Sequence, residues 1–160
     1  MFKTILVPTD GSRLSELAVA AAITFASETG ASLVAISVAE AYPYPMGSEG
    51  GIVPDMSGYE AALRETAGKH VQRIAEQAGA KNVPCKTTVV TGFTAADEIV
   101  NAAREFGCDL IWMASHGRTG MERMLMGSQT QKVLAHAVAP VLVYPLKKSL
   151  TAPTSTGELT

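Results

Sequence analysis

Short apolar runs alternate along this chain with longer segments in which apolar residues recur every three or four positions. Short runs rich in β-branched residues are typical of buried strands, and the longer spacing is typical of amphipathic helices. We therefore predict five strands, at residues 3–8, 32–39, 84–90, 109–114 and 140–145. Four helices are predicted between them, at residues 14–29, 59–79, 94–106 and 128–138.

Three of the predicted helices show one apolar face, which we expect to pack on the sheet. The face of the first helix consists of Leu14, Leu17, Ala18, Ala21, Ala22, Phe25 and Ala26. The faces of the second and third helices consist of Leu63, Ala67, Val71, Ile74 and Ala78, and of Ile99, Val100, Ala103 and Phe106. Gly30 is expected to end the first helix.

The alternation of strands and helices indicates an α/β protein. We predict a doubly wound, five-stranded parallel sheet of the Rossmann-like kind, with helices on both faces. The strand at 84–90 alternates and should be half exposed, whereas the strand at 109–114 is apolar and should be central. In such sheets ligands bind at the carboxyl ends of the strands, where the strand order reverses. Function is therefore expected just after the first, second and fourth strands.

Two segments lack a strand or helix pattern. Residues 41–58 carry three prolines and four glycines, which predicts a long loop with a functional or mobile role. The sequence leaves open whether this loop closes over a ligand. Residues 147–160 are polar and are expected to form a flexible tail behind a single domain at residues 1–146.

Composition narrows the class of protein. With 160 residues, 47% apolar and 18% charged, the chain fits one globular domain, and its net charge of −2 gives no electrostatic case for nucleic acid as a partner. We expect a soluble, cytoplasmic protein without a membrane partner, because no apolar run has the length of a membrane span or a signal-peptide core. Cys85 and Cys108 show neither metal-ligand spacing nor a disulfide framework, and we interpret them as reduced, structural thiols.

The turn after the first strand reads PTDGS. Pro8 ends the strand, Asp10 follows at the carboxyl edge of the sheet, and Ser12 is placed to cap the first helix. Asp, Gly and Ser are also the ordinary residues of such a turn. Taken alone, the turn favours a structural interpretation over a functional one.

The segment after the fourth strand, MASHGRTGMERMLMGSQTQKV (residues 113–133), is polar and rich in glycine. Its glycines would let the backbone approach a ligand closely. Ser128 and Gln131 are predicted to form a capping box at the start of a helix whose first-turn N–H groups favour anions. Arg118 would add charge-assisted hydrogen bonds. A capped helix behind a plain loop is the alternative, but the Asp-bearing turn one strand away favours a ligand site.

Together these stretches resemble the universal stress protein family. ILVPTDGS resembles the family's first strand, and SHGRTGMERMLMGSQTQKVL followed by APVLVYP resembles its end, so the resemblance spans residues 2–146. In the family's nucleotide-binding pattern, G-x-x-G is followed by nine residues and then G-[S/T], and here RTGMERMLM supplies the nine. Gly117, Gly127 and Ser128 match this pattern, but Ala114 replaces its first glycine. A methyl group there either crowds a phosphate or, where φ is negative, is harmless.

The resemblance implies a role for each matching position. Asp10, with the backbone of Pro8 and Thr9, would meet ribose and adenine, and Val38 would hold adenine through its backbone. The residues expected around the ribose and phosphates are Gly117, Arg118, Gly127, Ser128 and Gln129, with Ala114 at the first position of the pattern. His116 would neighbour a phosphate or a metal ion without being catalytic. The remaining histidines, His70 and His136, lie in predicted helices and are interpreted as packed or solvated.

The resemblance implies a stress-response sensor or regulator that binds ATP or AMP, with Mg²⁺ or Mn²⁺ as candidate metal ions and at most slow ATP hydrolysis. It also implies a homodimer that pairs through the strand at 140–145, and an unidentified regulatory protein partner. A dimeric interaction module that binds no nucleotide is the alternative. A true ATP-using enzyme is a third reading, which the sequence disfavours because no nucleophile–base pair and no second carboxylate accompany Asp10. The choice between ATP and AMP stays open.

Overall fold

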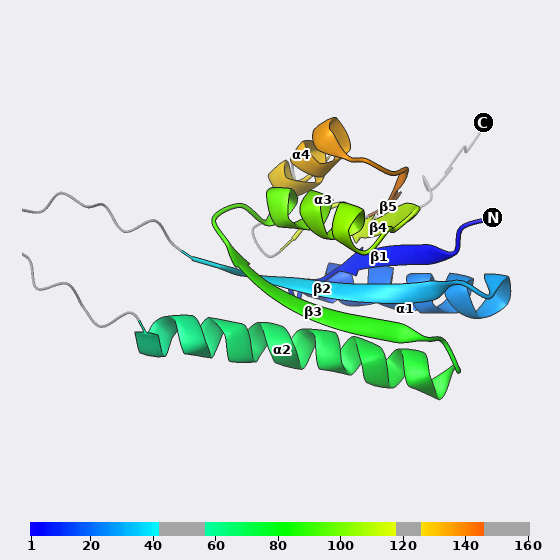
Figure 1. Ribbon diagram of the computed structural model, residues 1–160, viewed down its shortest axis with the longest axis horizontal. Helices are drawn as coiled ribbons and strands as arrows, with labels where there is room; N and C mark the ends of the chain where they lie inside the picture. The colour runs from blue at the N-terminus through cyan, green and yellow to red at the C-terminus, as the bar shows by residue number, and fades with distance from the viewer. Residues whose placement is uncertain (42–56, 118–125, 146–160) are drawn as a thin grey trace, which may run out of the picture.

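The computed structural model describes residues 1–41, 57–117 and 126–145 (Figure 1). The elements are β1 (Thr4–Pro8), α1 (Arg13–Thr29), β2 (Ser32–Glu40), α2 (Ser57–Ala80), β3 (Cys85–Gly92), α3 (Ala95–Glu105), β4 (Leu110–Ala114), α4 (Ser128–His136) and β5 (Val141–Tyr144). Nearly all of the predicted loop at 41–58, and the whole predicted tail at 147–160, lie outside the described residues. The predicted order of strands and helices is confirmed.

The strands form a parallel sheet in the order β3-β2-β1-β4-β5. The chain runs outward from β1 through β2 to β3, then returns to the other side of β1 with β4 and β5. The strand order therefore reverses between β1 and β4, and their carboxyl ends border the crevice in which this fold class binds ligands. The predicted α/β class and the interior position of β4 are both confirmed.

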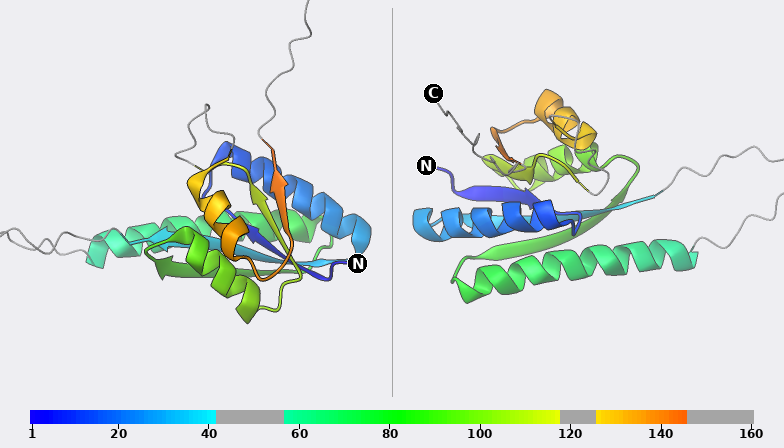
Figure 2. Two further views of the ribbon diagram at one scale, coloured as in Figure 1. Left: turned by 90° about the horizontal axis from the view of Figure 1, so that it is seen from above. Right: turned by 180° about the vertical axis from the view of Figure 1, so that it is seen from behind.

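Helices cover both faces of the sheet, α1 and α2 on one side and α3 and α4 on the other (Figures 1 and 2). Side chains along β1 alternate between the two sides. Ile5 and Val7 join the apolar cluster under α1 and α2, and Leu6 joins the cluster under α3. Burial on both faces explains why β1 reads as a continuous apolar run.

α1 packs on the sheet with most of the predicted face, but the buried side also includes Val19 and Ile23 and leaves out Leu17. Its buried residues are Ser15, Ala18, Val19, Ala22, Ile23 and Ala26. Leu17, which was predicted to face the core, is 48% exposed. The alanines spread around this helix make neighbouring faces almost equally apolar, so spacing alone does not fix where the buried face ends. The sheet selects the face that carries the branched side chains of Val19 and Ile23. Gly30 ends the helix at a φ of 74°, as predicted.

β2 and β3 continue past the end of β1. Pro8, the last residue of β1, lies opposite Ile36 of β2, but β2 runs on to Glu40, where it pairs with Gly92 of β3. The third strand is therefore longer than its predicted range of 84–90, because the extra residues find partners on β2. The two strands form a wall beside the carboxyl end of β1 (Figure 1).

Two helix ends differ from the prediction. α2 begins at Ser57, inside the predicted loop. Its second turn is tied to β3, because Arg64 Nη1 donates a hydrogen bond to Thr91 Oγ1 at 2.7 Å. α4 ends at His136, two residues before the predicted end at 138, and an extended residue follows it.

Candidate functional site

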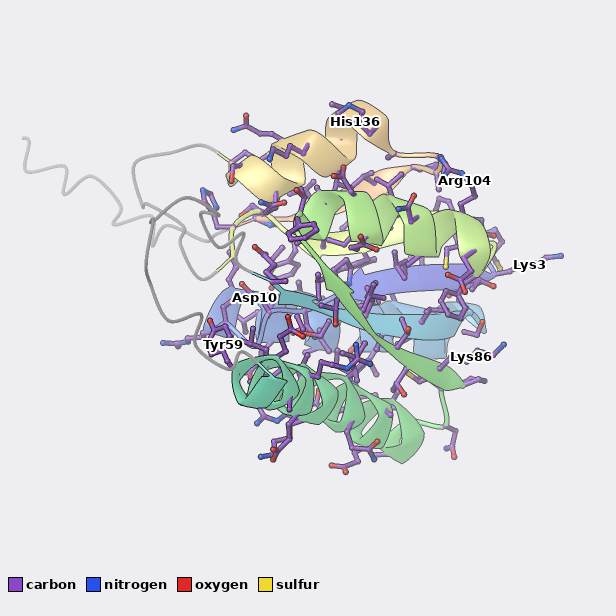
Figure 3. The ribbon with its side chains drawn as sticks, turned by 60° about the vertical axis from the view of Figure 1, so that its left-hand side comes forward. Lys3, Asp10, Tyr59, Lys86, Arg104 and His136 are labelled. Carbon is purple, nitrogen blue, oxygen red and sulfur yellow. The ribbon has the colours of Figure 1, made fainter. Side chains whose placement is uncertain are left out.

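The β1–α1 turn is held by its own side chains. The Asp10 carboxylate accepts a hydrogen bond at Oδ1 from Ser12 N at 2.9 Å, and Thr9 Oγ1 accepts one from Gly11 N at 3.1 Å. Gly11 has a φ of 74°, which favours glycine. Ser12 caps α1 by accepting from Ser15 N at 3.3 Å, as predicted. Asp10 therefore has a defined orientation just beyond the carboxyl end of β1 (Figure 3).

The carboxylate of Asp10 faces the segment that follows β4. A Cβ atom built on Gly117 would lie 2.7 Å from Asp10 Oδ2, which is closer than real Cβ contacts. Only a glycine lets the two chain segments approach this closely. The structure thus brings together Asp10 and Gly117, which the sequence places on separate loops.

The start of α4 packs on the exit of β4. Gly127 N donates to Ser115 O at 2.8 Å, and a Cβ atom on Gly127 would lie 3.2 Å from both His116 Cα and Ser115 O. The Thr130 hydroxyl donates to Ala114 O at 3.1 Å or to Ser115 O at 3.2 Å. Gly127 therefore lets the first turn of α4 lie directly against the backbone of residues 115–117.

The predicted capping box at the start of α4 is wrong. The N-cap is Gly127, with φ −66° and ψ 150°, and Ser128 is already the first helical residue. Its hydroxyl therefore stands one position too late to cap. The Gln131 side chain does not bond the N-cap amide, as a capping box requires, but donates to Met126 O at 2.9 Å.

The first turn of α4 still carries the features of an anion site. The N–H groups of Ser128, Gln129 and Thr130 have no acceptor one turn earlier in the helix, as at every helix N-terminus. The helix dipole adds partial positive charge at the same point. These groups lie beside Gly127 and hence beside residues 115–117.

The Gln129 side chain serves the fold. Its Oε1 accepts a hydrogen bond from Ala96 N at 3.0 Å, in the first turn of α3. Thr94, the N-cap of α3, makes no side-chain capping bond, so Gln129 supplies the missing acceptor. The predicted place of Gln129 beside a phosphate would therefore rest on its backbone N–H and stays a prediction.

Ala114 fits its position without backbone strain. It is the last residue of β4, it pairs with Tyr144, and it is absent from the described residues with positive φ. Its methyl group belongs to the apolar cluster under α1. Alanine is therefore tolerated by the backbone at the first position of the glycine pattern.

The other predicted residues after β4 are only partly described. His116 is buried, with Nδ1 3.1 Å from the Ser115 hydroxyl. Arg118 lies outside the described residues, so its predicted place near a phosphate stays a prediction.

Val38 lies on β2 beyond the end of β1. Two residues earlier, the carbonyl oxygen of Ile36 accepts a hydrogen bond from Thr9 N at 2.9 Å. Backbone groups of a strand face the same side every second residue, so the N–H and C=O of Val38 also point to the β1 side, where β1 has ended. The Ser37 hydroxyl donates to Thr9 O at 2.9 Å, so both backbone polar groups of Thr9 are engaged with β2.

His70 of α2 also reaches this site, which the sequence did not reveal. A Cβ atom on Gly11 would lie 2.2 Å from His70 Nε2. The histidine is packed, as interpreted, but against the turn that carries Asp10. Its helical spacing contains no signal of this contact, because its partner is remote in the chain. His136, by contrast, has Nδ1 2.9 Å from Lys132 O on the exposed side of α4.

The cysteines lie away from the site and are unsuited to nucleophilic chemistry. Burial and the neighbouring Asp109 carboxylate raise the pKa of Cys108 to about 11. Burial also raises the pKa of the Cys85 thiol. Both thiols are free. A protonated thiol is a poor nucleophile, which agrees with a structural role for both.

Within the described ranges, no three His, Cys, Asp or Glu side chains gather into a group suited to a metal ion. No helix in the same ranges combines the length and apolar character that a membrane span requires.

The chain is similar to proteins of one family. Residues 1–145 match the universal stress protein family. The universal stress protein MJ0531 of Methanocaldococcus jannaschii is 36% identical over 146 residues, which cover 89% of this chain and 82% of that protein. MJ0577, a universal stress protein of the same organism, has a solved structure with a TM-score of 0.73 and 27% identity, covering 93% of this chain and 99% of that chain.

A more distant structure shares the fold. It is a universal stress protein in complex with cAMP, with a TM-score of 0.61 and 24% identity, covering 89% of this chain and 97% of that chain. This structure and the chain therefore share the same architecture. The family match covers most of the chain, and MJ0531 is 36% identical to it. Both findings agree with the family resemblance of the glycine pattern and with the parallel sheet. The chain belongs to the universal stress protein family.

Proposed function

We propose that this protein binds ATP or AMP at the carboxyl edge of the sheet, between the β1–α1 turn and the first turn of α4. The observation that carries the proposal is the approach of Asp10 to Gly117, with a carboxylate oxygen 2.7 Å from the position of a Cβ atom on Gly117. The absence of a side chain at Gly117 lets the Asp10 carboxylate lie against the segment after β4, and a carboxylate in that place suits a ligand with hydroxyl donors. It lies at the reversal of strand order, where this fold class binds nucleotides.

The parts of a nucleotide match the groups around the crevice. The Asp10 carboxylate accepts hydrogen bonds, as ribose hydroxyls require, beside the backbone of Pro8 and Thr9. The Val38 peptide groups offer one donor and one acceptor to adenine. The first-turn N–H groups of α4, at Ser128 and Gln129, suit phosphate oxygens.

Cationic groups complete the proposed phosphate side. Arg118, and Mg²⁺ or Mn²⁺ carried by the phosphates, would balance the negative charge there. His116 and Gly127 would line the same side, next to Ala114. The universal stress protein in complex with cAMP supports nucleotide binding in general, because that protein has the same fold and is in complex with an adenine nucleotide.

We propose that nucleotide binding serves sensing or regulation in the stress response, through an unidentified protein partner in the cytoplasm. Among the described residues, the groups around Asp10 offer acceptors, N–H donors, the His70 ring and His116 beside Ser115, and the thiols lie elsewhere. That set suits binding and orientation better than rapid turnover. Hydrolysis of ATP, if any, is expected to be slow.

The proposal is tested by asking what the purified protein carries. The protein is purified without added nucleotide and denatured, and the supernatant is analysed by HPLC with mass detection. Stoichiometric ATP or AMP is the expected result. An empty protein that also shows no heat of binding with millimolar ATP or AMP would leave the dimeric interaction module as the remaining reading.

A substitution at Gly127 tests whether the nucleotide binds in this crevice. Gly127→Val places a side chain against His116 Cα and Ser115 O and should remove nucleotide-dependent thermal stabilisation. Gly79→Val is the matched control, because a Cβ atom on Gly79 meets nothing within 4 Å. Equal thermal shifts with ATP in both variants would contradict the assigned site.

We also propose that two copies pair through β5. β5 lies at the edge of the sheet, and each of its residues, Val141–Tyr144, is only half-buried. An apolar edge strand exposes unpaired peptide groups, which a symmetry-related copy would satisfy. Pro140 and Pro145 bound the strand and limit how far such pairing extends.

A further inference from the structure

We infer that His70 of α2 is a positioning residue for the proposed nucleotide site. Its ring supports the β1–α1 turn at Gly11 and thereby keeps the Asp10 carboxylate directed at Gly117. This inference rests on the proposed nucleotide binding and extends it to a helix that contributes no residue to the glycine pattern.

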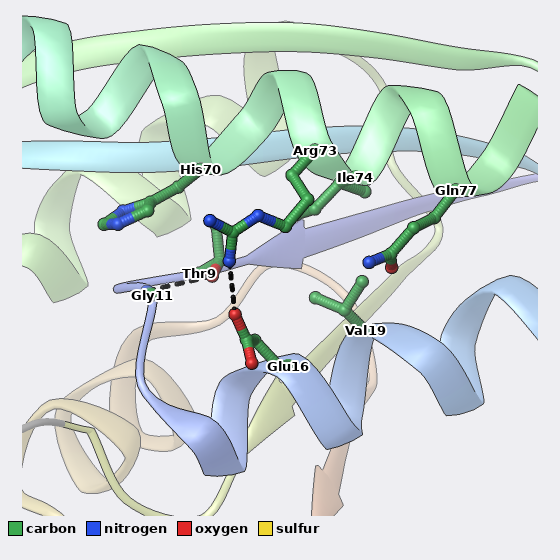
Figure 4. A pocket seen from close by; sticks show the side chains of 8 residues that line it. All are labelled: Thr9, Gly11, Glu16, Val19, His70, Arg73, Ile74 and Gln77. Carbon is green, nitrogen blue, oxygen red and sulfur yellow. Dashed lines mark hydrogen bonds and ion pairs between the residues drawn. The ribbon is translucent and has the colours of Figure 1, made fainter.

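The His70 ring lies where a side chain at position 11 would start. A Cβ atom on Gly11 would lie 2.2 Å from Nε2, 2.4 Å from Cε1 and 2.8 Å from Cδ2 of the His70 ring. The ring therefore occupies the space that any side chain at position 11 would need. Figure 4 shows it extending from α2 alongside the turn.

The turn is held from three directions. Its inner face is tied by hydrogen bonds from Ser12 N to Asp10 Oδ1 and from Gly11 N to Thr9 Oγ1. On the sheet side, the Ser37 hydroxyl bonds Thr9 O. The His70 ring provides the contact from α2. Because Gly11 directly follows Asp10, a shift of its backbone would change the direction of the Asp10 side chain.

α2 is held firmly enough to act as a support. Its Arg73 Nη1 pairs with Glu16 Oε1 of α1 at 2.6 Å, one turn beyond His70 (Figure 4). Val71 and Ile74 are buried in the core. His70 therefore lies on a stretch of α2 that is fixed against α1 and the core.

A small cavity adjoins the ring. Its lining consists of Thr9, Gly11, Glu16, Val19, His70, Arg73, Ile74 and Gln77. Truncation of His70 would enlarge this cavity directly beneath the turn. The turn would then gain freedom to move, since close packing is what restricts it.

The test compares ATP affinity in two truncation variants by isothermal titration calorimetry. His70→Ala removes the ring from the turn, and Val71→Ala removes buried volume from the same helix away from the turn. We expect His70→Ala to weaken ATP binding roughly tenfold or more, because small misplacements of a binding group are costly. Val71→Ala should lower Tm with the ATP dissociation constant unchanged. His70→Phe, which keeps a flat ring in place, should restore most of the affinity.

A second measurement shows whether His70 acts through Asp10. Asp10 is assigned to the ribose, so wild-type protein should prefer ATP over 2′,3′-dideoxy-ATP. His70→Ala should reduce that preference, whereas general loosening of the fold would weaken both ligands equally. His70→Asn provides the same measurement should the alanine variant fail to fold.

The outcomes separate the two proposals. If wild-type protein binds ATP but His70→Ala binds it equally well, or loses both ligands in proportion, the role of His70 is overturned and nucleotide binding stands. If wild-type protein binds no nucleotide, both are overturned.

Discussion

Asp10 and Gly117, which follow different strands, meet at the reversal of strand order with 2.7 Å between Asp10 Oδ2 and the position of a Cβ atom on Gly117. Gly117 therefore leaves room for the side chain of Asp10, which lies far from it in the sequence. This relationship combines the two weakest sequence signals, a common turn and a glycine-rich loop, into one site.

The first prediction concerns this contact. Gly117→Ala should displace the Asp10 carboxylate and weaken ATP binding roughly tenfold or more. Gly58→Ala, in the first turn of α2 where an added Cβ meets nothing within 4 Å, is the control. Calorimetric titration with ATP measures both. An unchanged affinity in Gly117→Ala would show that the carboxylate does not contribute to binding.

The second prediction compares two glycines with the same backbone angle. Gly11 and Gly30 both have a φ of 74°, but an added Cβ at Gly30 meets nothing, whereas at Gly11 it meets the His70 ring. Gly30→Ala should cost about 1–2 kcal/mol, the expense of a left-handed alanine. Gly11→Ala should lower the free energy of unfolding by more than this, because the added methyl group also meets the His70 ring.

The double variant isolates the ring contact. Combining Gly11→Ala with His70→Ala should recover the excess cost, because the clash is gone while the backbone cost remains. Urea unfolding measures each free energy. If the substitutions at Gly11 and Gly30 lower the free energy of unfolding equally, the His70 ring moves aside freely.

The third prediction separates two roles of Gln129. Its Oε1 bonds Ala96 N at 3.0 Å, so Gln129→Ala should lower stability by about 1 kcal/mol through loss of a cap on α3. ATP affinity should stay within about twofold, since the backbone N–H remains (a twofold change is about 0.4 kcal/mol). A large loss of affinity at unchanged Tm would instead assign the side chain to the ligand.

The fourth prediction concerns pH and the opposite end of the sheet. The Asp109 carboxyl, although partial burial favours its neutral form, has its pKa lowered by hydrogen bonds from Lys3 N and Thr4 N. A lowered folded-state pKa means that the carboxylate stabilises the protein above its unfolded pKa of about 3.9, and that this contribution is lost as pH falls through the folded value.

Asp109→Asn should remove this pH dependence. Near neutral pH the variant should be less stable by no more than about 1 kcal/mol, because the carboxyl is only partly buried and solvent screens its interactions. The difference from wild type should shrink toward acid pH. Urea midpoints between neutral pH and pH 3 test this, and a difference that stays constant over the range would refute it.

The fifth prediction concerns assembly. Val143→Glu puts a charge in the half-buried edge strand β5 and should convert the proposed dimer into a monomer. Analytical ultracentrifugation at micromolar concentration measures the change. Lys132→Glu, which alters charge on an exposed position of α4, is the control. A wild-type monomer would remove the basis for pairing through β5.

Much of the fold was predictable because its signals are local. A strand buried on both faces must be apolar throughout, so β1 and β4 are evident from their residues alone. The order of strands and helices then limits the topology to a doubly wound parallel sheet. The glycine spacing after β4 likewise identified the loop that meets Asp10.

The sequence predictions were wrong where several placements of a helix fit the same pattern of residues. On the alanine-rich α1, spacing placed Leu17 in the buried face and left out Val19 and Ile23, which contact with the sheet selects. Ser128 and Gln131 have the spacing of a capping box, yet the helix begins one residue too early for it. Such choices depend on how a helix is docked, which local spacing does not encode.

By itself, then, the sequence determined the elements, their order, the parallel sheet and the residues at its carboxyl edge, because apolar periodicity and turn chemistry act over a few neighbouring positions. Tertiary structure alone decided that Asp10 faces Gly117, that Gln129 caps α3 and that His70 packs on Gly11. Each of these contacts joins residues from different loops or helices. Their distances are set by the packing of whole elements on the sheet, and no spacing along the chain records them.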